Sequence, residues 1–297
     1  MNSKSIKIIF VIIALFLSVE LTLRMAQPYL SKDIKHYKAL ASIVEKFDKS
    51  EVDKVLFIGN SLTREGVDKE KFEKNEKGLT LIRPDDTTVT EWFWIFKSKI
   101  YDKDIKVTDL AIIFVGDQLE DKPLKEQNLV SISNIVNTSE MFSVREFEVL
   151  SLSDLITLTL SHFSVTFASR ERVQRRVLDL LPMYREQSRI INRSLVEGHV
   201  QSSKDKKKAT YKHLLELIKL AQEKNIHLTF ISSPLLKAYT LDRDLLNIFN
   251  KSESISFINA KDEVQVDKTD FQDGYHLNKE GASKFTEYIL EAKTFSF

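Results

Sequence analysis

Short apolar runs alternate with longer amphipathic stretches over most of the chain after residue 52. The runs are rich in strand-forming residues and end at turn signals; they cover residues 54–58, 79–82, 110–115, 226–231 and 255–258. Stretches with helical spacing lie between or after them, at about residues 87–101, 204–224 and 241–250 and again after Gly281. Strands that alternate with helices in this way are typical of a parallel sheet. We therefore expect an α/β domain over residues 52–297.

This alternation stops between about residues 120 and 200, where the pattern indicates no convincing strand. Helical stretches can instead be drawn at about residues 144–167, 169–181 and 184–195, the last two on either side of a proline. The pattern predicts a helical insertion at about 120–200 that lies over or beside the sheet.

The N-terminus contains an apolar segment, residues 8–19, with Lys4 and Lys7 before it. Its length suits the apolar core of a signal peptide, but no small-x-small cleavage site follows it. A helix from about residue 5 to residue 23 is just long enough to span a bilayer, and the two lysines favour the cytoplasmic side for its start. We expect an uncleaved anchor over residues 1–30, a connecting helix over 31–51 and the remaining chain outside the cytoplasm. A buried core helix is the alternative.

Composition narrows the classes of partner and chemistry. The 44 basic and 43 acidic residues give a net charge of +1, so no overall field attracts nucleic acid, and we expect no nucleic-acid partner. The absence of cysteine excludes disulfides, thiolate metal sites and a cysteine nucleophile. The six histidines are scattered without metal-ligand spacing, so we expect neither a metal nor another cofactor.

Ser61 is the first candidate for chemistry. It follows the predicted strand 54–58 and the turn residue Gly59. Ligands of open α/β sheets bind beyond the carboxyl ends of the strands, so Ser61 stands at the usual position of a site. The alternative is structural, because Asn60 and Ser61 are also residue types that cap the start of a helix.

Asp273 and His276 are the second candidate. They are three residues apart on a glycine-containing turn just before the last helix, for which Asn278 is a plausible cap. With Ser61 they supply the parts of a nucleophilic triad: His276 would take the Ser61 proton, and Asp273 would orient the imidazole. Without the serine, an Asp-x-x-His pair is a weak signal, and a surface-loop histidine is the alternative.

Taken together, the two segments resemble the SGNH/GDSL hydrolase superfamily. Its nucleophile block is similar to residues 59–62, and its Asp-x-x-His block is similar to residues 273–278, continued by 280–282. The resemblance covers roughly residues 52–292. It implies a three-layer α/β/α sandwich around a five-stranded parallel sheet, with Ser61, Asp273 and His276 as the catalytic residues. The five-residue Gly-x-Ser-x-Gly elbow of α/β-hydrolases is incomplete, because Thr63 replaces its second glycine.

The chain departs from this family where the oxyanion donors are expected. A glycine amide follows the second strand in the family, whereas this chain has Arg83-Pro84-Asp85-Asp86. An Asn side chain follows the third strand in the family, whereas this chain has Gly116-Asp117-Gln118. Gln118 could donate through its amide, but an ionised Asp117 would repel an oxyanion. We take Gln118, Asp117 and Asp86 as candidate oxyanion or substrate residues.

The anchor, which ends in Glu20-Leu21-Thr22-Leu23-Arg24, looks like that of membrane-tethered proteins of cell-surface polysaccharide modification. These include proteins of exopolysaccharide acetylation and of teichoic acid D-alanylation. The resemblance implies an extracytoplasmic esterase or O-acyltransferase that acts on a carbohydrate ester, acetyl first, with a multi-pass membrane acyltransferase as a possible partner. The alternatives are a catalytically inactive scaffold or glycan-binding subunit, favoured by the altered oxyanion positions, and a cytosolic small-molecule esterase.

Overall fold

The computed structural model describes residues 3–30, 32–49, 54–74, 78–184 and 208–292. Contacts divide the chain into two compact units. The first unit comprises residues 1–35 and 141–209, and the second comprises residues 36–140 and 210–297. The helical stretch expected at about 184–195 lies almost entirely outside the described residues.

The second unit is built on a five-stranded sheet in which every strand pairing is parallel, in the order β2-β1-β3-β4-β5. The strands are β1 (Lys54–Ile58), β2 (Gly78–Ile82), β3 (Asp109–Phe114), β4 (His227–Ser232) and β5 (Ile255–Ile258). All five strands expected from the apolar runs are present, and the α/β class is confirmed. β3 is buried along its whole length, which explains its uninterrupted apolar sequence.

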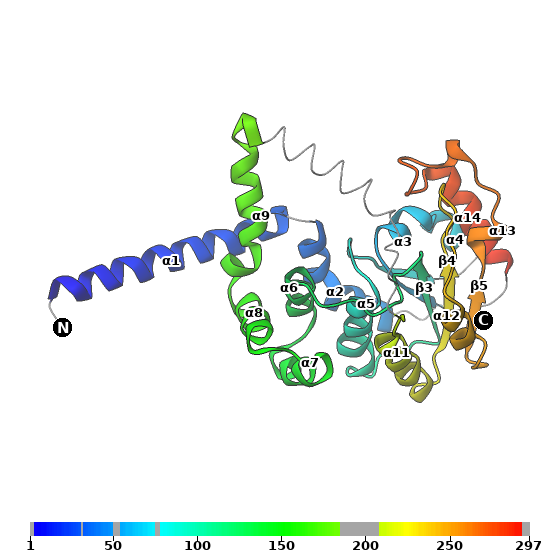
Figure 1. The fold of residues 1–297 in the computed structure, drawn as a ribbon, viewed down its shortest axis with the longest axis horizontal. Coiled ribbons are helices and arrows are strands. Elements are labelled where there is room, and N and C mark those ends of the chain that lie inside the picture. Colours follow the sequence, from blue (N-terminus) through cyan, green and yellow to red (C-terminus); the bar gives the residue numbers. More distant parts are fainter. Residues whose placement is uncertain (1–2, 31, 50–53, 75–77, 185–207, 293–297) are drawn as a thin grey trace. The chain divides into compact units, whose positions relative to one another are not determined.

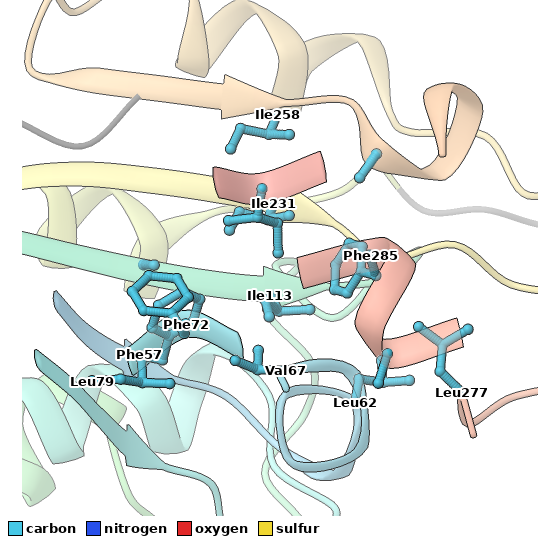
Figure 2. Packing of buried hydrophobic residues seen from close by; sticks show 14 of the residues in the cluster. Phe57, Leu62, Val67, Phe72, Leu79, Ile113, Ile231, Ile258, Leu277 and Phe285 are labelled. Atoms are coloured by element: carbon cyan, nitrogen blue, oxygen red, sulfur yellow. The ribbon is translucent and has the colours of Figure 1, made fainter. Parts of the chain in front are cut away.

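Helices cover both faces of this sheet. Figure 2 shows the core on one face, where Phe57 of β1 and Ile113 of β3 pack with Phe72 and Phe285. Phe72 belongs to α4 (Lys69–Glu73), and Phe285 belongs to α14 (Lys279–Glu291). α3 (Ser61–Gly66) and α13 (Ala260–Glu263) complete this layer.

The opposite face is covered mainly by α5 (Val89–Phe96), α11 (Lys212–Glu223) and α12 (Arg243–Phe249). Successive strand residues point to opposite faces, so Phe230 of β4 points away from the core of Figure 2. Its ring stacks on Phe249 of α12, with centroids 4.7 Å apart. The remaining elements of the unit are η1 (Lys97–Tyr101), α6 (Glu126–Ile135), η2 (Thr138–Glu140) and η3 (Lys268–Asp270), together with most of α2 (Lys32–Asp48).

One expected helix is shorter than its sequence pattern indicates. The pattern favoured residues 204–224, but residues 208–211 are not helical and α11 begins at Lys212. The reason is a cap from a distant segment: the Asp121 carboxylate accepts hydrogen bonds from the N–H groups of Lys212, at 2.5 Å, and His213, at 3.1 Å. A carboxylate stabilises the positive end of a helix, and this one sets where the helix starts.

The first unit contains α1 (Ser3–Leu30), α7 (Met141–Glu148), α8 (Leu152–Phe163) and α9 (Val165–Asp179) (Figure 1). Residues 5–26 of α1 are long and apolar enough to cross a membrane, as expected. The single helix expected at 144–167 is wrong. The chain breaks at Val149, which adopts φ 54°, and again at Ser164, because serines 151 and 164 cap α8 and α9 with their side chains. Among the described residues of this unit no strand occurs.

Candidate active site

Ser61 is the first residue of α3, directly beyond the carboxyl end of β1. Asn60 is the helix cap: its Oδ1 accepts the N–H of Leu62 at 3.0 Å, and its Nδ2 donates to the Thr87 carbonyl at 3.0 Å. The Asn60 side chain is buried, so both bonds are shielded from water. Asn60 therefore performs the capping role that the sequence left open for both residues, and the Ser61 hydroxyl is left available for another contact.

Asp273 and His276 lie on a turn closed by its own backbone. The N–H of Gln272 donates to the His276 carbonyl at 2.8 Å, and Phe271 forms an isolated bridge with Leu277. Gly274 adopts φ 80°, a conformation that favours glycine. Because the chain reverses there, Asp273 Oδ1 accepts the N–H groups of Tyr275, at 3.0 Å, and His276, at 2.7 Å. Asn278 caps the following helix α14, as expected.

The structure brings the three side chains into one hydrogen-bonded chain. His276 Nε2 lies 2.9 Å from Ser61 Oγ, and His276 Nδ1 lies 2.8 Å from Asp273 Oδ2. An ionised carboxylate can only accept, so the ring proton is on Nδ1, and Nε2 is left to accept the Ser61 hydroxyl. This is the arrangement in which an imidazole can act as a base toward a serine.

The surroundings of Asp273 keep its carboxyl group ionised. Partial burial of this group opposes its ionisation, but hydrogen bonds from the His276 ring and from the N–H groups of His276 and Tyr275 outweigh burial and lower its pKa below the ordinary value. The side chain of Asp273 is 55% exposed, whereas that of His276 is only 26% exposed. The ionised Asp273 carboxylate therefore keeps a negative charge beside the His276 ring, on the side nearer to solvent.

Gln118 is also brought to this turn. Its Oε1 accepts the N–H of Val115 at 3.0 Å, which fixes the orientation of the amide. Its Nε2 points to the Tyr275 hydroxyl, 3.4 Å away. The Gln118 carbonyl in turn accepts the N–H of Val89, the first residue of α5, at 3.0 Å. The side-chain amide of Gln118 is thus held in a fixed orientation, with its NH2 group directed to Tyr275, the residue before His276.

The acidic residues that replace the expected donors are neutralised or exposed. Asp117 forms an ion pair with Lys122 at 2.9 Å, and its side chain is 61% exposed. Asp85 is paired with Arg64 of α3. Asp86 is exposed and adopts φ 53°, the left-handed conformation otherwise typical of glycine. The repulsion expected from Asp117 is therefore weakened by its lysine partner.

Two residues near the triad were not anticipated from the sequence. The Tyr275 ring packs edge-on against His276, with centroids 5.1 Å apart. Burial raises the pKa of Tyr275 to about 12, with smaller contributions from Asp117 and Asp86, so its hydroxyl remains protonated at neutral pH. Glu65 lies one turn after Ser61 on α3. Burial opposes its ionisation, but the hydrogen bond and charge of Arg64, together with smaller contributions from Gln272 and His276, outweigh burial and lower the pKa of Glu65. Tyr275 could have been noticed by its place inside the Asp-x-x-His segment.

Comparisons with known proteins add a description of similar folds. No family model matches the chain, and no curated protein sequence matches it. A candidate acylhydrolase from Bacteroides fragilis is 13% identical with a TM-score of 0.40, over 82% of this chain and 87% of that chain. A GDSL-like lipase from Bacteroides thetaiotaomicron is 11% identical with a TM-score of 0.40, over 88% of this chain and 97% of that chain. These similarities are too low to carry an argument about activity.

Proposed function

We propose that this chain is a membrane-anchored serine enzyme of the SGNH type that transfers acyl groups from esters, as an esterase or an O-acyltransferase. The observation that carries the proposal is the continuous hydrogen-bonded chain from Ser61 Oγ through His276 to Asp273. Ser61 is more than two hundred positions from Asp273 and His276 in the sequence, and the three residues meet at the sheet edge where α/β enzymes hold their ligands. A histidine that merely stabilised a surface loop would not need this alignment.

The reaction follows from the proton positions. Ser61 Oγ attacks the ester carbonyl carbon while its proton passes to His276 Nε2, and Asp273 stabilises the resulting imidazolium. When the tetrahedral intermediate collapses, the C–O bond to the leaving alcohol breaks, and His276 returns the proton to that alcohol. The acyl group is then on Ser61. Water or an acceptor hydroxyl, deprotonated by His276, releases it as an acid or a new ester.

The negative oxygen of the intermediate needs hydrogen-bond donors. Gln118 Nε2 is one donor in this proposal, because the bond from Val115 to Oε1 keeps the amide nitrogen on the site side. The N–H of Ser61 is the second, because the first turn of a helix has no internal acceptors for its N–H groups. One such donor typically contributes a factor of about 10²–10³ to the rate.

The substrate and the location are proposed from the sequence. The apolar helix α1 and the resemblance to tethered proteins of polysaccharide modification favour an extracytoplasmic site and a carbohydrate O-acyl ester, acetyl first. A multi-pass membrane acyltransferase is a suitable partner for such a protein. A reporter enzyme that works only outside the cytoplasm, fused after residue 30, should be active. A fusion that is active only in the cytoplasm would contradict the proposed location.

A fluorophosphonate probe tests the chemistry directly, because it reacts with activated serines. We expect the full chain to be labelled at Ser61 and the Ser61→Ala variant to remain unlabelled. Ser233→Ala is the matched control, because Ser233 follows β4 at the same edge of the sheet and should be dispensable. A folded protein that is not labelled, or is labelled elsewhere, would overturn the proposal and favour the inactive scaffold.

The carbohydrate assignment has its own test. The full chain and Ser61→Ala should be compared on p-nitrophenyl acetate and on an O-acetylated oligosaccharide, with acetate release and acetyl transfer to an added sugar both measured. Ser61-dependent turnover of the sugar ester would support the assignment. Turnover of the phenyl ester alone would retain the acyl chemistry and reject the carbohydrate substrate.

A further inference from the structure

Exposed large apolar side chains are concentrated in the first unit of this protein. In the described part of the second unit only three large apolar side chains are exposed: Leu215, Leu236 and Tyr275. Between residues 141 and 184 of the first unit the exposed side chains are those of Phe142, Val149, Leu152, Ile156, Leu160, Phe163, Val177, Leu180, Leu181, Met183 and Tyr184. An apolar surface of this extent on one part of a protein marks an interaction site.

The most regular part of this surface is the apolar stripe of α8, formed by Leu152, Ile156, Leu160 and Phe163. These residues are spaced by four, four and three positions, so they follow one another along a single face of the helix. Their side chains are 74%, 49%, 43% and 55% exposed, respectively. Serines, threonines, Asp154 and His162 occupy much of the remaining helix surface. The described residues of the chain leave this apolar face of the helix exposed.

The end of α8 is attached to α1, the helix that is able to cross a membrane. The Glu20 carboxylate accepts hydrogen bonds from Ser164 Oγ at 2.9 Å and from the N–H groups of Val165 at 2.8 Å and Thr166 at 3.0 Å. Arg24 donates to the Phe163 carbonyl at 2.7 Å and pairs with Glu20 at 2.9 Å. The junction between α8 and α9 is thus held on one turn of α1. These bonds also explain how α1 accommodates a carboxylate in an apolar stretch.

The position of this attachment along α1 determines its depth in a bilayer. Glu20 is six residues before Ala26, the end of the segment that can span a membrane, which corresponds to about 9 Å along a helix. Amphipathic helices at a membrane surface place their apolar face about 5–10 Å into the boundary of headgroups and acyl chains. α9 also runs across α1 near its C-terminal end rather than alongside it (Figure 1). α9, which begins where α8 ends, therefore lies along the surface of a bilayer that α1 spans.

We propose that α8 is a second membrane-binding element, whose apolar stripe lies in the lipid boundary while α1 spans the bilayer. We favour lipid as the partner of this stripe because the hydrogen bonds of Glu20 and Arg24 join the end of α8 to α1, a helix that itself requires lipid. This inference rests on the anchoring part of the proposed function and not on its chemistry. It gives the first unit two attachments to the membrane, which restrict its rotation about the axis of α1.

Single cysteines test this arrangement without interference, because the chain has none of its own. The full chain is reconstituted into phosphatidylcholine and phosphatidylglycerol vesicles, with the fluorophore NBD on Ile156→Cys or Leu160→Cys. Lipids that carry a doxyl quencher near the headgroup should reduce the emission of both labels, as expected for side chains in the lipid boundary. Aqueous iodide should have little effect on these labels.

Three matched labels complete the experiment. Thr157→Cys, a partly exposed position about 100° around α8 from the centre of the stripe, and Leu215→Cys, an exposed apolar position in the second unit, should be quenched by iodide and not by the doxyl lipid. Ile12→Cys in α1 reports on the anchor itself.

If Ile12 is quenched by lipid and the stripe labels respond to iodide, the inference fails while the anchor stands. Stripe labels that neither quencher reaches would show a protein cover, such as the second unit or another copy, and would also overturn it. If Ile12 is not quenched by lipid, the anchor and this inference fail together.

Discussion

The side-chain amide of Asn60 donates to the carbonyl of Thr87, 3.0 Å away, and so ties the turn before Ser61 to the loop that follows β2. The Thr87 hydroxyl continues this connection, because it donates to the Pro84 carbonyl at 2.8 Å and accepts the Trp92 indole N–H at 2.9 Å. Ser61 is thereby positioned by buried hydrogen bonds that involve two strand ends and a helix.

Asn60→Ser is expected to separate the two functions of this residue. Serine is as good a helix cap as asparagine, so α3 should keep its start, but serine lacks the second arm that reaches Thr87. We expect the rate of fluorophosphonate labelling to fall, with a smaller loss of stability than in Asn60→Ala, which also loses the cap and about 1 kcal/mol with it. Thermal unfolding and labelling kinetics measure the two effects. Wild-type labelling in Asn60→Ser would show that the Thr87 bond does not position the nucleophile.

Asp273→Asn should preserve the turn and abolish the chemistry. The asparagine oxygen can still accept the N–H groups of Tyr275 and His276, but its amide would donate to His276 Nδ1 and force the proton onto Nε2. The imidazole is then unable to accept the Ser61 proton. A loss of about 10⁴-fold in turnover is the usual size of this effect. Asp262→Asn, which removes an exposed carboxylate elsewhere in the unit, is the control and should retain activity. Near-normal turnover in Asp273→Asn would contradict the triad.

Gln118→Glu tests the proposed oxyanion donor. Glutamate keeps an oxygen that can accept the Val115 N–H, but it replaces the donating Nε2 with a second oxygen. We expect turnover to fall by about 10²–10³-fold while the melting temperature changes little. Thermal unfolding and steady-state kinetics on p-nitrophenyl acetate give both quantities. If turnover is unchanged, the oxyanion is held by other groups.

Tyr275→Phe removes only the hydroxyl that Gln118 contacts. One hydrogen bond is worth about 0.5–1.5 kcal/mol, so kcat/KM should fall by roughly 2–10-fold. Because the pKa of Tyr275 is about 12, the wild-type hydroxyl stays neutral near pH 7 and well above it. The ratio of wild-type to variant kcat/KM should therefore be constant from about pH 6 to about pH 9. A ratio that changes within this range would show that an ionised Tyr275 takes part.

The cap on α11 predicts a pH dependence of stability. Burial opposes ionisation of Asp121, but hydrogen bonds from the His213 ring, at 2.6 Å, and from the N–H groups of His213 and Lys212 outweigh burial and lower its pKa. A carboxyl group whose pKa is lowered by folding stabilises the folded state above its unfolded pKa, about 3.9, and this contribution is lost as the pH falls through the folded value. Asp121→Asn should therefore be less stable than the wild type at neutral pH.

The difference between the two proteins should shrink below about pH 4. Urea unfolding of both proteins across this range is the measurement. A difference in unfolding free energy that is as large in acid as at neutral pH would contradict an ionised Asp121 as its source.

The five strands were predictable because their signal is local. Each strand of a buried parallel sheet needs an apolar run of about five residues, and a turn residue such as Gly59 marks its end. The sequence also indicated which residues could form the site, because the strand end before Ser61 and the short Asp273 to His276 turn are themselves local patterns. The roles of those residues remain predictions until the experiments above are done.

Other features depended on partners far away in the sequence. The start of α11 is set by Asp121, some ninety residues earlier, and the break between α8 and α9 is stabilised by Glu20, more than one hundred and forty residues earlier. A helical pattern in one segment contains no information about a carboxylate that arrives from another. For this reason the start expected for the helix at 204–224 and the single helix expected at 144–167 are wrong, although both regions contain helix and α11 ends at Glu223, close to the expected limit.

The sequence by itself therefore determined the strands, the apolar N-terminal helix and the chemical types of the candidate residues, since each depends on neighbours along the chain. Only the tertiary structure decided that Asn60 takes the capping role, that Ser61 lies 2.9 Å from His276, and that Gln118 is oriented toward Tyr275. The physical reason is that a hydrogen bond requires its two atoms to be about 3 Å apart. Residues 61, 118 and 276 come within hydrogen-bonding distance of their partners only when the chain folds.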